Sequence, residues 1–184
     1  MISLTWIGAL TVETSVSAFV DADKGYVGRS IFIDPHIYEQ ESKKVFARSW
    51  LYLCHDSQIP NPGDFCTAYM GEDPVVVWRD KDGTINAFLN VCRHRGNRLC
   101  RADSGNASGL TCTYHGWTYG SDGSLKGVPH QSTAYGCDFD RQKWPLVSVA
   151  QLDTCNGLVF ATFDKSAPSL REYLGEKAWY LDAV

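Results

Sequence analysis

Two short cysteine–histidine pairs lie near the middle of this 184-residue chain. Cys92 and His94 form a C-x-H pair, and Cys112 and His115 form a C-x-x-H pair after 17 intervening residues. A thiolate is a soft ligand and an imidazole a borderline one. Four such side chains therefore suit either a tetrahedral zinc ion or an iron–sulfur cluster. The spacing predicts a metal centre that is bound between two loops.

The division of the ligands favours iron. In a Rieske centre two histidines replace two cysteines on one iron of a [2Fe–2S] cluster, so the protein supplies two thiolates and two imidazoles. One residue of each kind per loop meets this need. Gly96 and Gly116 follow the histidines closely, where the backbone would approach inorganic sulfides and donate N–H groups. A structural Cys2His2 zinc domain remains the alternative.

Charge and composition exclude several other functions. The net charge is a mild −4, with both signs interspersed, so no nucleic-acid or membrane-surface partner is expected. No apolar run reaches the roughly 18 residues that span a bilayer. No Lys or Arg precedes Lys24, so the N-terminus lacks a secretory signal and we expect a cytoplasmic protein. Of the seven cysteines, all except Cys92 and Cys112 are interpreted as buried or half-buried small hydrophobes.

The elements that must position the two pairs are mainly strands. Before them, Asp34 and Pro35 predict the start of a helix with Tyr38, Val45 and Phe46 on one face. From Trp50 onward the expected strands are WLYLC, DFCTAYM, PVVVWR, INAFLN, LTCTY, SLKGV, LVSVAQL and GLVFATF. Between them stand the turn signals PNPGD, DKDG, SDGS and CNG.

This pattern predicts a mainly β fold, an antiparallel β-sandwich with flanking N- and C-terminal helices. Residues 1–49 form the N-terminal helical segment, 50–163 the β domain, and 164–184 a linker with the second helix. In that last segment Ser169 is the expected cap, with Leu170, Tyr173 and Leu174 on one face.

The stretch CRHRGNRLCRADSGNASGLTCTYHGW resembles the Rieske motif of aromatic-ring-hydroxylating dioxygenase large (alpha) subunits, such as those acting on naphthalene, biphenyl or polycyclic aromatics. IFIDPHIYEQESKKVFARSWLYLCHDSQIPNPGDF, YMGEDPVVV and YLGEKAWYLD resemble the N-terminal part of the same subunits. The likeness covers roughly residues 18–184 and leaves the first 17 unexplained.

The resemblance implies one [2Fe-2S] cluster per chain. Cys92 and Cys112 would bind the inner iron, and His94 and His115 the outer iron nearer the surface, with Trp117 packed beside the cluster. A ferredoxin or reductase would supply electrons in an NADH-dependent system. Four arginines beside the histidines would either steer that acidic partner or form internal salt bridges and packing within the loop: Arg93, Arg95, Arg98 and Arg101.

In this family dioxygen reacts at a mononuclear Fe(II), held by two histidines and a carboxylate in a downstream catalytic domain. No histidine follows His130, and His36, His55 and His130 are interpreted as structural. We therefore expect no catalytic residue here. The chain is interpreted as a fragment or truncated product of a bacterial alpha subunit. The resemblance implies that such a subunit carries a catalytic domain and assembles with other alpha and beta subunits, α3β3-like in the family. The substrate cannot be read from this part. An autonomous Rieske-type ferredoxin is the alternative, opposed by the two flanking helices.

Overall fold

The computed structural model describes residues 19–136 and 138–182. The chain divides into two compact units, residues 1–45 and residues 46–184. The first 17 residues and Cys137 lie outside the described part, so the interpretation of Cys137 as a buried hydrophobe stays a prediction. No helix in the described ranges is both long and apolar enough to cross a membrane.

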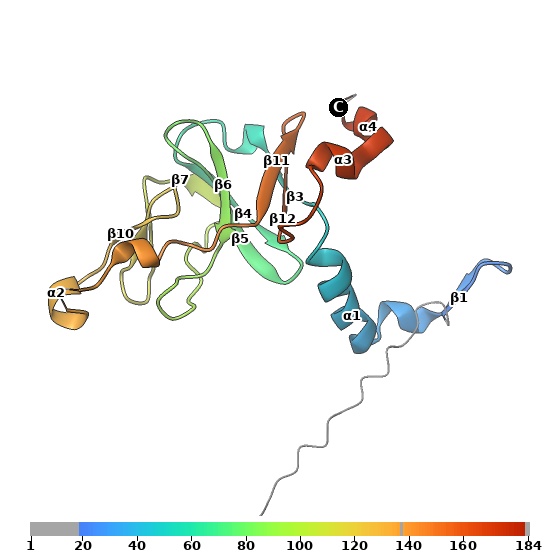
Figure 1. The fold of residues 1–184 in the computed structure, drawn as a ribbon, viewed down its shortest axis with the longest axis horizontal. Helices are drawn as coiled ribbons and strands as arrows, with labels where there is room; N and C mark the ends of the chain where they lie inside the picture. The colour runs from blue at the N-terminus through green and yellow to red at the C-terminus, as the bar shows by residue number, and fades with distance from the viewer. Residues whose placement is uncertain (1–18, 137, 183–184) are drawn as a thin grey trace, which may run out of the picture. The chain divides into compact units, whose positions relative to one another are not determined.

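In its described residues, 19–45, the N-terminal unit contains a short antiparallel ribbon and one α-helix (Figure 1). Its elements are β1 (Val20–Asp21), β2 (Tyr26–Val27), the 3-10 turn η2 (Arg29–Phe32) and α1 (Pro35–Glu41). The predicted cap is confirmed, because the Asp34 side chain accepts a hydrogen bond from the His36 backbone N–H at 2.8 Å.

The predicted apolar face of this helix is wrong. Tyr38 and Val45 are 45% and 49% exposed, whereas Ile37 is 2% exposed. The reason is the π-helical segment η3 (Ser42–Phe46), which directly follows α1 and has a wider turn than an α-helix. The 3.6-residue period on which the prediction depends therefore does not extend beyond Glu41.

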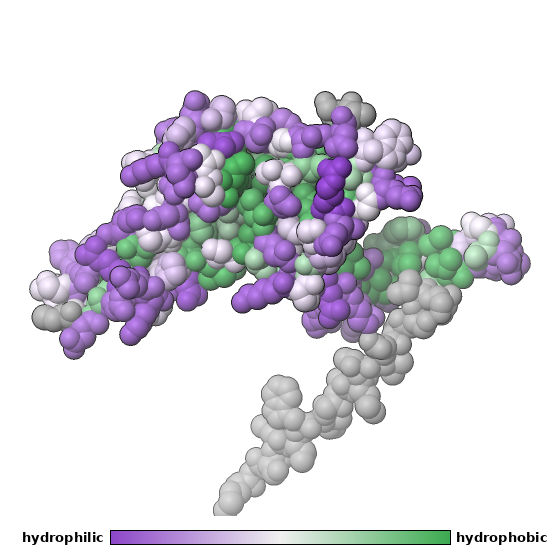
Figure 2. Space-filling model, turned by 45° about the horizontal axis from the view of Figure 1, so that its top comes forward, coloured by the Kyte–Doolittle hydropathy of each residue, from purple (hydrophilic) through white to green (hydrophobic). Residues whose placement is uncertain are grey.

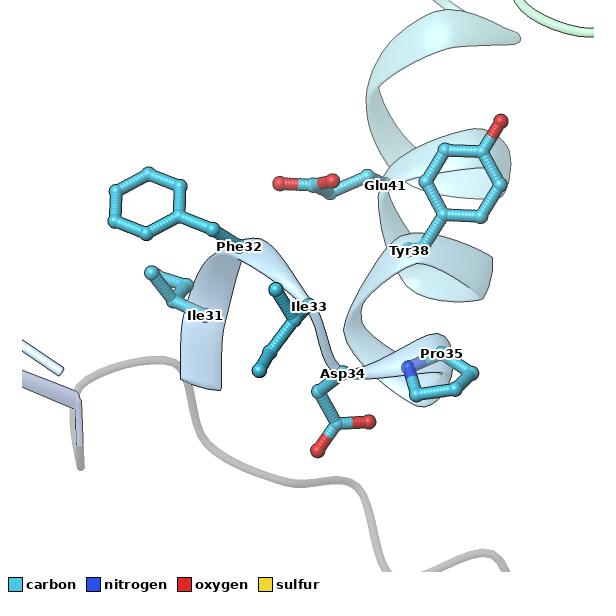
Figure 3. Close-up of a pocket in the computed structure, with 7 residues that line it drawn as sticks. All are labelled: Ile31, Phe32, Ile33, Asp34, Pro35, Tyr38 and Glu41. Atoms are coloured by element: carbon cyan, nitrogen blue, oxygen red, sulfur yellow. The ribbon is translucent and has the colours of Figure 1, made fainter. Parts of the chain in front are cut away.

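An open hollow of about 380 Å³ lies between η2 and α1. Apolar side chains of η2 and side chains of α1 line it (Figure 3). Phe32 and Ile33 are 78% and 69% exposed, and hydrophobic residues crowd the visible face of this unit (Figure 2).

The second unit is built from three antiparallel sheets, so the prediction of a mainly β, antiparallel fold is confirmed. The sheets are β6-β5-β4-β7, β11-β12-β3 and β10-β9-β8. Their strands are β3 (Leu51–His55), β4 (Asp64–Met70), β5 (Asp73–Arg79), β6 (Ile85–Leu89), β7 (Ser104–Asn106), β8 (Leu110–Thr111), β9 (Thr118–Tyr119), β10 (Leu125–Gly127), β11 (Gln151–Cys155) and β12 (Leu158–Thr162).

Strand β5 explains why the four-stranded sheet stands at the centre of this unit. Val75 and Val77 belong to a core shared with β3, β11 and β12. Val76 and Trp78 belong to a second core, which contains both motif cysteines. A strand that is buried on both faces needs a continuous apolar run, and PVVVWR provides it.

Short helical segments complete the unit: η4 (Asp56–Gln58), α2 (Gln131–Ala134), η5 (Arg141–Lys143), α3 (Leu170–Leu174), η6 (Gly175–Lys177) and α4 (Ala178–Leu181). Helix α3 lies beside β11 (Figure 1). Ser169 caps it as predicted, in a reciprocal capping box with Glu172. Its expected face is correct for Leu170, which is 1% exposed, but wrong for Tyr173, which is 47% exposed.

The predicted turns agree with the structure better than the predicted strand limits do. The CNG signal forms the β11–β12 hairpin, where Asn156 and Gly157 have φ of +48° and +81°. LVSVAQL is strand only from Gln151 onward, because the preceding residues contact β6 through an isolated bridge. Strands β1, β2, β7 and β9 are not among the predicted strands.

Candidate metal centre

The two motif loops share one backbone design. The first follows β6 and the second joins β8 to β9. In each loop the cysteine N–H donates to the carbonyl five residues later, and the glycine N–H four residues later donates to the cysteine carbonyl. In the first loop these bonds join Cys92 to Asn97 at 2.8 Å and Gly96 to Cys92 at 2.9 Å. In the second they join Cys112 to Trp117 at 2.8 Å and Gly116 to Cys112 at 2.9 Å. Both glycines have positive φ, +71° and +73°, which favours glycine there. Their proposed approach to inorganic sulfide stays a prediction.

The two cysteines form a buried pair. Cys92 and Cys112 are 2% and 3% exposed and belong to the same buried core, where each thiol influences the ionisation of the other. Burial raises the pKa of the Cys92 thiol, although the His94 N–H and the Tyr119 hydroxyl oppose that rise. Burial also opposes ionisation of Cys112, but neighbouring N–H groups outweigh it and lower the pKa of that thiol.

Those N–H groups come from the backbone of Tyr114 and His115 and from the Asn97 side chain. Cys112 is therefore the sulfur in this pair with more donors to hold negative charge.

The two histidines form a second pair, nearer the surface than the cysteines. The His94 and His115 ring centroids are 4.6 Å apart in an edge-on arrangement. His94 stacks on buried Trp117 at 4.9 Å, and exposed Tyr114 stacks on His115 at 3.7 Å. Trp117 thus contacts the site directly, although from sequence it was expected only to pack beside a cluster.

His94 has one ring nitrogen without a partner. Its Nδ1 is buried and unbonded, while its Nε2 lies 3.2 Å from the Tyr135 hydroxyl. Burial lowers the pKa of His94, helped by His115 and the Arg95 charge. A neutral imidazole with an unused buried lone pair is what a metal ligand requires.

The four predicted ligands therefore come together as a cysteine pair and a histidine pair. No group of three or more His, Cys, Asp or Glu side chains in the described part is arranged around a single ion. This donor set fits two irons that each take two protein ligands, which is the division in a Rieske cluster.

Tyrosines at the site were not found from sequence. The Tyr119 hydroxyl lies 3.6 Å from Cys92 Sγ and accepts the Arg93 N–H at 3.1 Å. The Tyr135 hydroxyl accepts from Trp117 Nε1 at 3.3 Å besides contacting His94. Tyr119 could have been suspected two residues after the motif tryptophan, whereas nothing in the sequence around Tyr135 marks it.

The four arginines divide into two kinds. Arg93, Arg95 and Arg101 are exposed, and none of the four forms an ion pair with a carboxylate in residues 19–136 or 138–182. Arg98 instead donates to the Tyr69 hydroxyl at 2.9 Å and lies over that ring. The prediction of internal salt bridges for these arginines is therefore wrong. The predicted packing is seen for Arg98, whose side chain lies against Tyr69.

The other three histidines lie outside this site. The His36 N–H is capped at the start of α1, and the His55 ring caps η4 by accepting the Ser57 N–H. His130 precedes α2 with φ of +54°.

Comparison with known protein families matches residues 49–152 to the Rieske [2Fe-2S] domain. This chain is a member of that family. Its cofactor is therefore a [2Fe–2S] cluster, in agreement with the donor set above.

Three known proteins are similar to this Rieske chain over most of its length. It is 47% identical to the benzene 1,2-dioxygenase alpha subunit of Pseudomonas putida over 92% of its length, and 45% identical to the biphenyl dioxygenase alpha subunit of Paraburkholderia xenovorans over 97%. It covers 37% and 40% of those two proteins. A solved naphthalene 1,2-dioxygenase with bound indole has a TM-score of 0.80 and 48% identity, over 83% of this chain and 34% of that one.

Proposed function

We propose that this Rieske chain relays single electrons within an aromatic-ring-hydroxylating dioxygenase, as part of its alpha subunit. The observation that carries the proposal is the buried cysteine pair beside a histidine pair with an unbonded Nδ1. The similarity to dioxygenase alpha subunits over 92% of the chain favours this function over an autonomous ferredoxin.

In this proposal Cys92 and Cys112 hold one iron, and His94 and His115 hold the other. When bound, the cluster supplies one-electron chemistry at roughly −150 to +300 mV, because neutral imidazoles leave it less negative than four thiolates would. Residues 50–163 would form this electron-transfer domain, and residues 164–184 the linker toward a catalytic domain.

The surrounding residues of the chain hold these ligands and keep water out. Trp117 is 1% exposed, and its ring fixes the plane of the His94 imidazole by stacking. Tyr135 accepts from Trp117 and occupies His94 Nε2, so Nδ1 is left as the free nitrogen. Tyr119 is fully buried and directs its hydroxyl at Cys92.

The partners in this proposal follow from charge and from the relatives. Exposed Arg93, Arg95 and Arg101 lie in the loop that carries Cys92 and His94, and would attract an acidic ferredoxin or reductase. The electron acceptor would be a mononuclear Fe(II) in a catalytic domain, within an oligomer of alpha and beta subunits in the bacterial cytoplasm.

An aromatic hydrocarbon is the proposed substrate class. Named relatives at 45–47% identity are benzene and biphenyl dioxygenases. A solved quaternary ammonium Rieske monooxygenase is also similar in structure, with a TM-score of 0.74, but only 31% identical.

Metal analysis with spectroscopy tests the proposal. Aerobically purified protein should contain about two irons per chain and no zinc, and after reduction by one electron it should give the paramagnetic resonance signal of a Rieske cluster. Given NADH, a ferredoxin and its reductase, the 184-residue chain should cycle between redox states while naphthalene remains unchanged. One zinc per chain, or a cis-dihydrodiol product with a third iron, would contradict it.

A further inference from the structure

Asn97 touches both cysteine loops. Its backbone carbonyl accepts the Cys92 N–H at 2.8 Å, within the first loop. Its side-chain Nδ2 reaches the second loop, 3.6 Å from Cys112 Sγ and 3.4 Å from Thr113 Oγ1. The same Nδ2 also lies 3.0 Å from the Arg98 carbonyl oxygen.

We infer that Asn97 is a positioning residue that fastens the two loops together and donates an amide N–H to the Cys112 sulfur. This inference rests on the proposed ligand set and adds a residue to it. Asn97 lies within the motif stretch, between Gly96 and Arg98, but its side chain has no role among the expected ligands and their neighbours.

The number of N–H groups on the Asn97 amide supports a hydrogen bond to the Cys112 sulfur. An asparagine amide carries two N–H groups, and the Arg98 carbonyl takes one of them. The other lies between Cys112 Sγ and Thr113 Oγ1. Thr113 is exposed, so its hydroxyl can form a hydrogen bond with water instead. Cys112 is 3% exposed, so water cannot serve as a hydrogen-bond donor to its sulfur. A buried thiolate is the acceptor that gains most from the second N–H.

The contact has a counterpart on the other cysteine. Tyr119, on β9 directly after the second loop, contacts Cys92 in the first loop at 3.6 Å. Asn97, in the first loop, contacts Cys112 in the second at 3.6 Å. Each sulfur therefore receives one side-chain donor from the other side of the site. The two crossed contacts tie each sulfur to the opposite loop and so keep the pair together, as the single iron that both would hold requires.

The contact between Asn97 and Cys112 has two measurable consequences. A donor to a thiolate favours the more negative, reduced cluster, so removing it should move the reduction potential downward. Loosening the loops should also let the cluster leave faster.

The test compares three variants with the wild type. Asn97→Leu keeps the size of the side chain and removes its polar atoms, while Asn97→Gln keeps the amide on a longer arm. Asn106→Ala is the matched control, because it removes an asparagine amide bonded to the Pro62 carbonyl and the Asp64 carboxylate, away from the cysteines. The measurements are the reduction potential, the resonance g values and the rate of iron release to a chelator.

We expect Asn97→Leu to shift the potential downward, alter the g values and release iron several-fold faster. Asn97→Gln should fall between Asn97→Leu and wild type, and Asn106→Ala should keep the wild-type potential. A Leu variant with wild-type potential and g values, or a Gln variant identical to Leu, would overturn the inference. A wild-type protein without a Rieske signal would instead reject the proposed function, so the two failures are distinguishable.

Discussion

Replacing Tyr119 with phenylalanine should lower the reduction potential of the cluster. The Tyr119 hydroxyl accepts the Arg93 N–H at 3.1 Å, which turns its own hydrogen toward Cys92 Sγ at 3.6 Å. Burial and the neighbouring Cys92 sulfur raise the pKa of Tyr119, so the phenol stays protonated and able to donate. Tyr119→Phe removes this one donor and keeps the ring.

The size of the shift follows from the burial of the contact. Tyr119 is 0% exposed, so water does not replace the lost hydroxyl. A hydrogen bond to a charged group contributes roughly 1.5–3 kcal/mol, but only its change on reduction affects the potential. Taking that change as about 0.5–1.5 kcal/mol, the potential should fall by about 20–65 mV, since about 59 mV corresponds to a tenfold equilibrium change for one electron.

Redox titration of the purified protein, followed by visible spectroscopy, measures this shift. Tyr69→Phe is the control, because the Tyr69 hydroxyl bonds Arg98 and is 54% exposed rather than aimed at a cysteine. The control should keep the wild-type potential. If Tyr119→Phe also keeps it, the hydroxyl does not act on a cluster sulfur and the geometric argument fails.

Three further predictions concern other parts of the site. If a cluster still assembles, His94→Cys should lower its potential toward the roughly −400 mV of plant-type ferredoxins in the same titration, and an unchanged value would reject His94 as a ligand. Gly116→Ala should lower the free energy of unfolding by about 2–4 kcal/mol in urea, because the new Cβ would have a positive φ and lie 2.7 Å from a proline ring carbon. Gly83→Ala, with positive φ but open space, should cost only about 1–2 kcal/mol, and equal losses would exclude the clash. Arg93→Gln with Arg95→Gln should slow reduction by an acidic ferredoxin several-fold at low salt in stopped-flow, whereas a deficit that persists near 1 M salt would argue against steering.

Local features of the chain were readable from sequence because neighbouring residues determine them. The Asp34 cap, the Ser169 cap and the Asn156–Gly157 turn each depend on bonds or backbone angles within a few residues. The two cysteine–histidine pairs belong to this class as well, since each pair occupies a single loop. Ligand chemistry could therefore be predicted before any fold was known.

Longer-range contacts were decided only by the tertiary structure. Strand β7 has the sequence Ser-Gly-Asn, which has no strand preference, and it forms because the edge of β4 offers unpaired backbone groups to it. Tyr135 reaches His94 across 41 residues, and Tyr119 reaches Cys92 across 27. No local pattern encodes such pairs, because they depend on how the sheets pack. The sequence by itself thus determined which side chains could bind the metal, whereas packing decided which neighbours orient those side chains and donate hydrogen bonds to them.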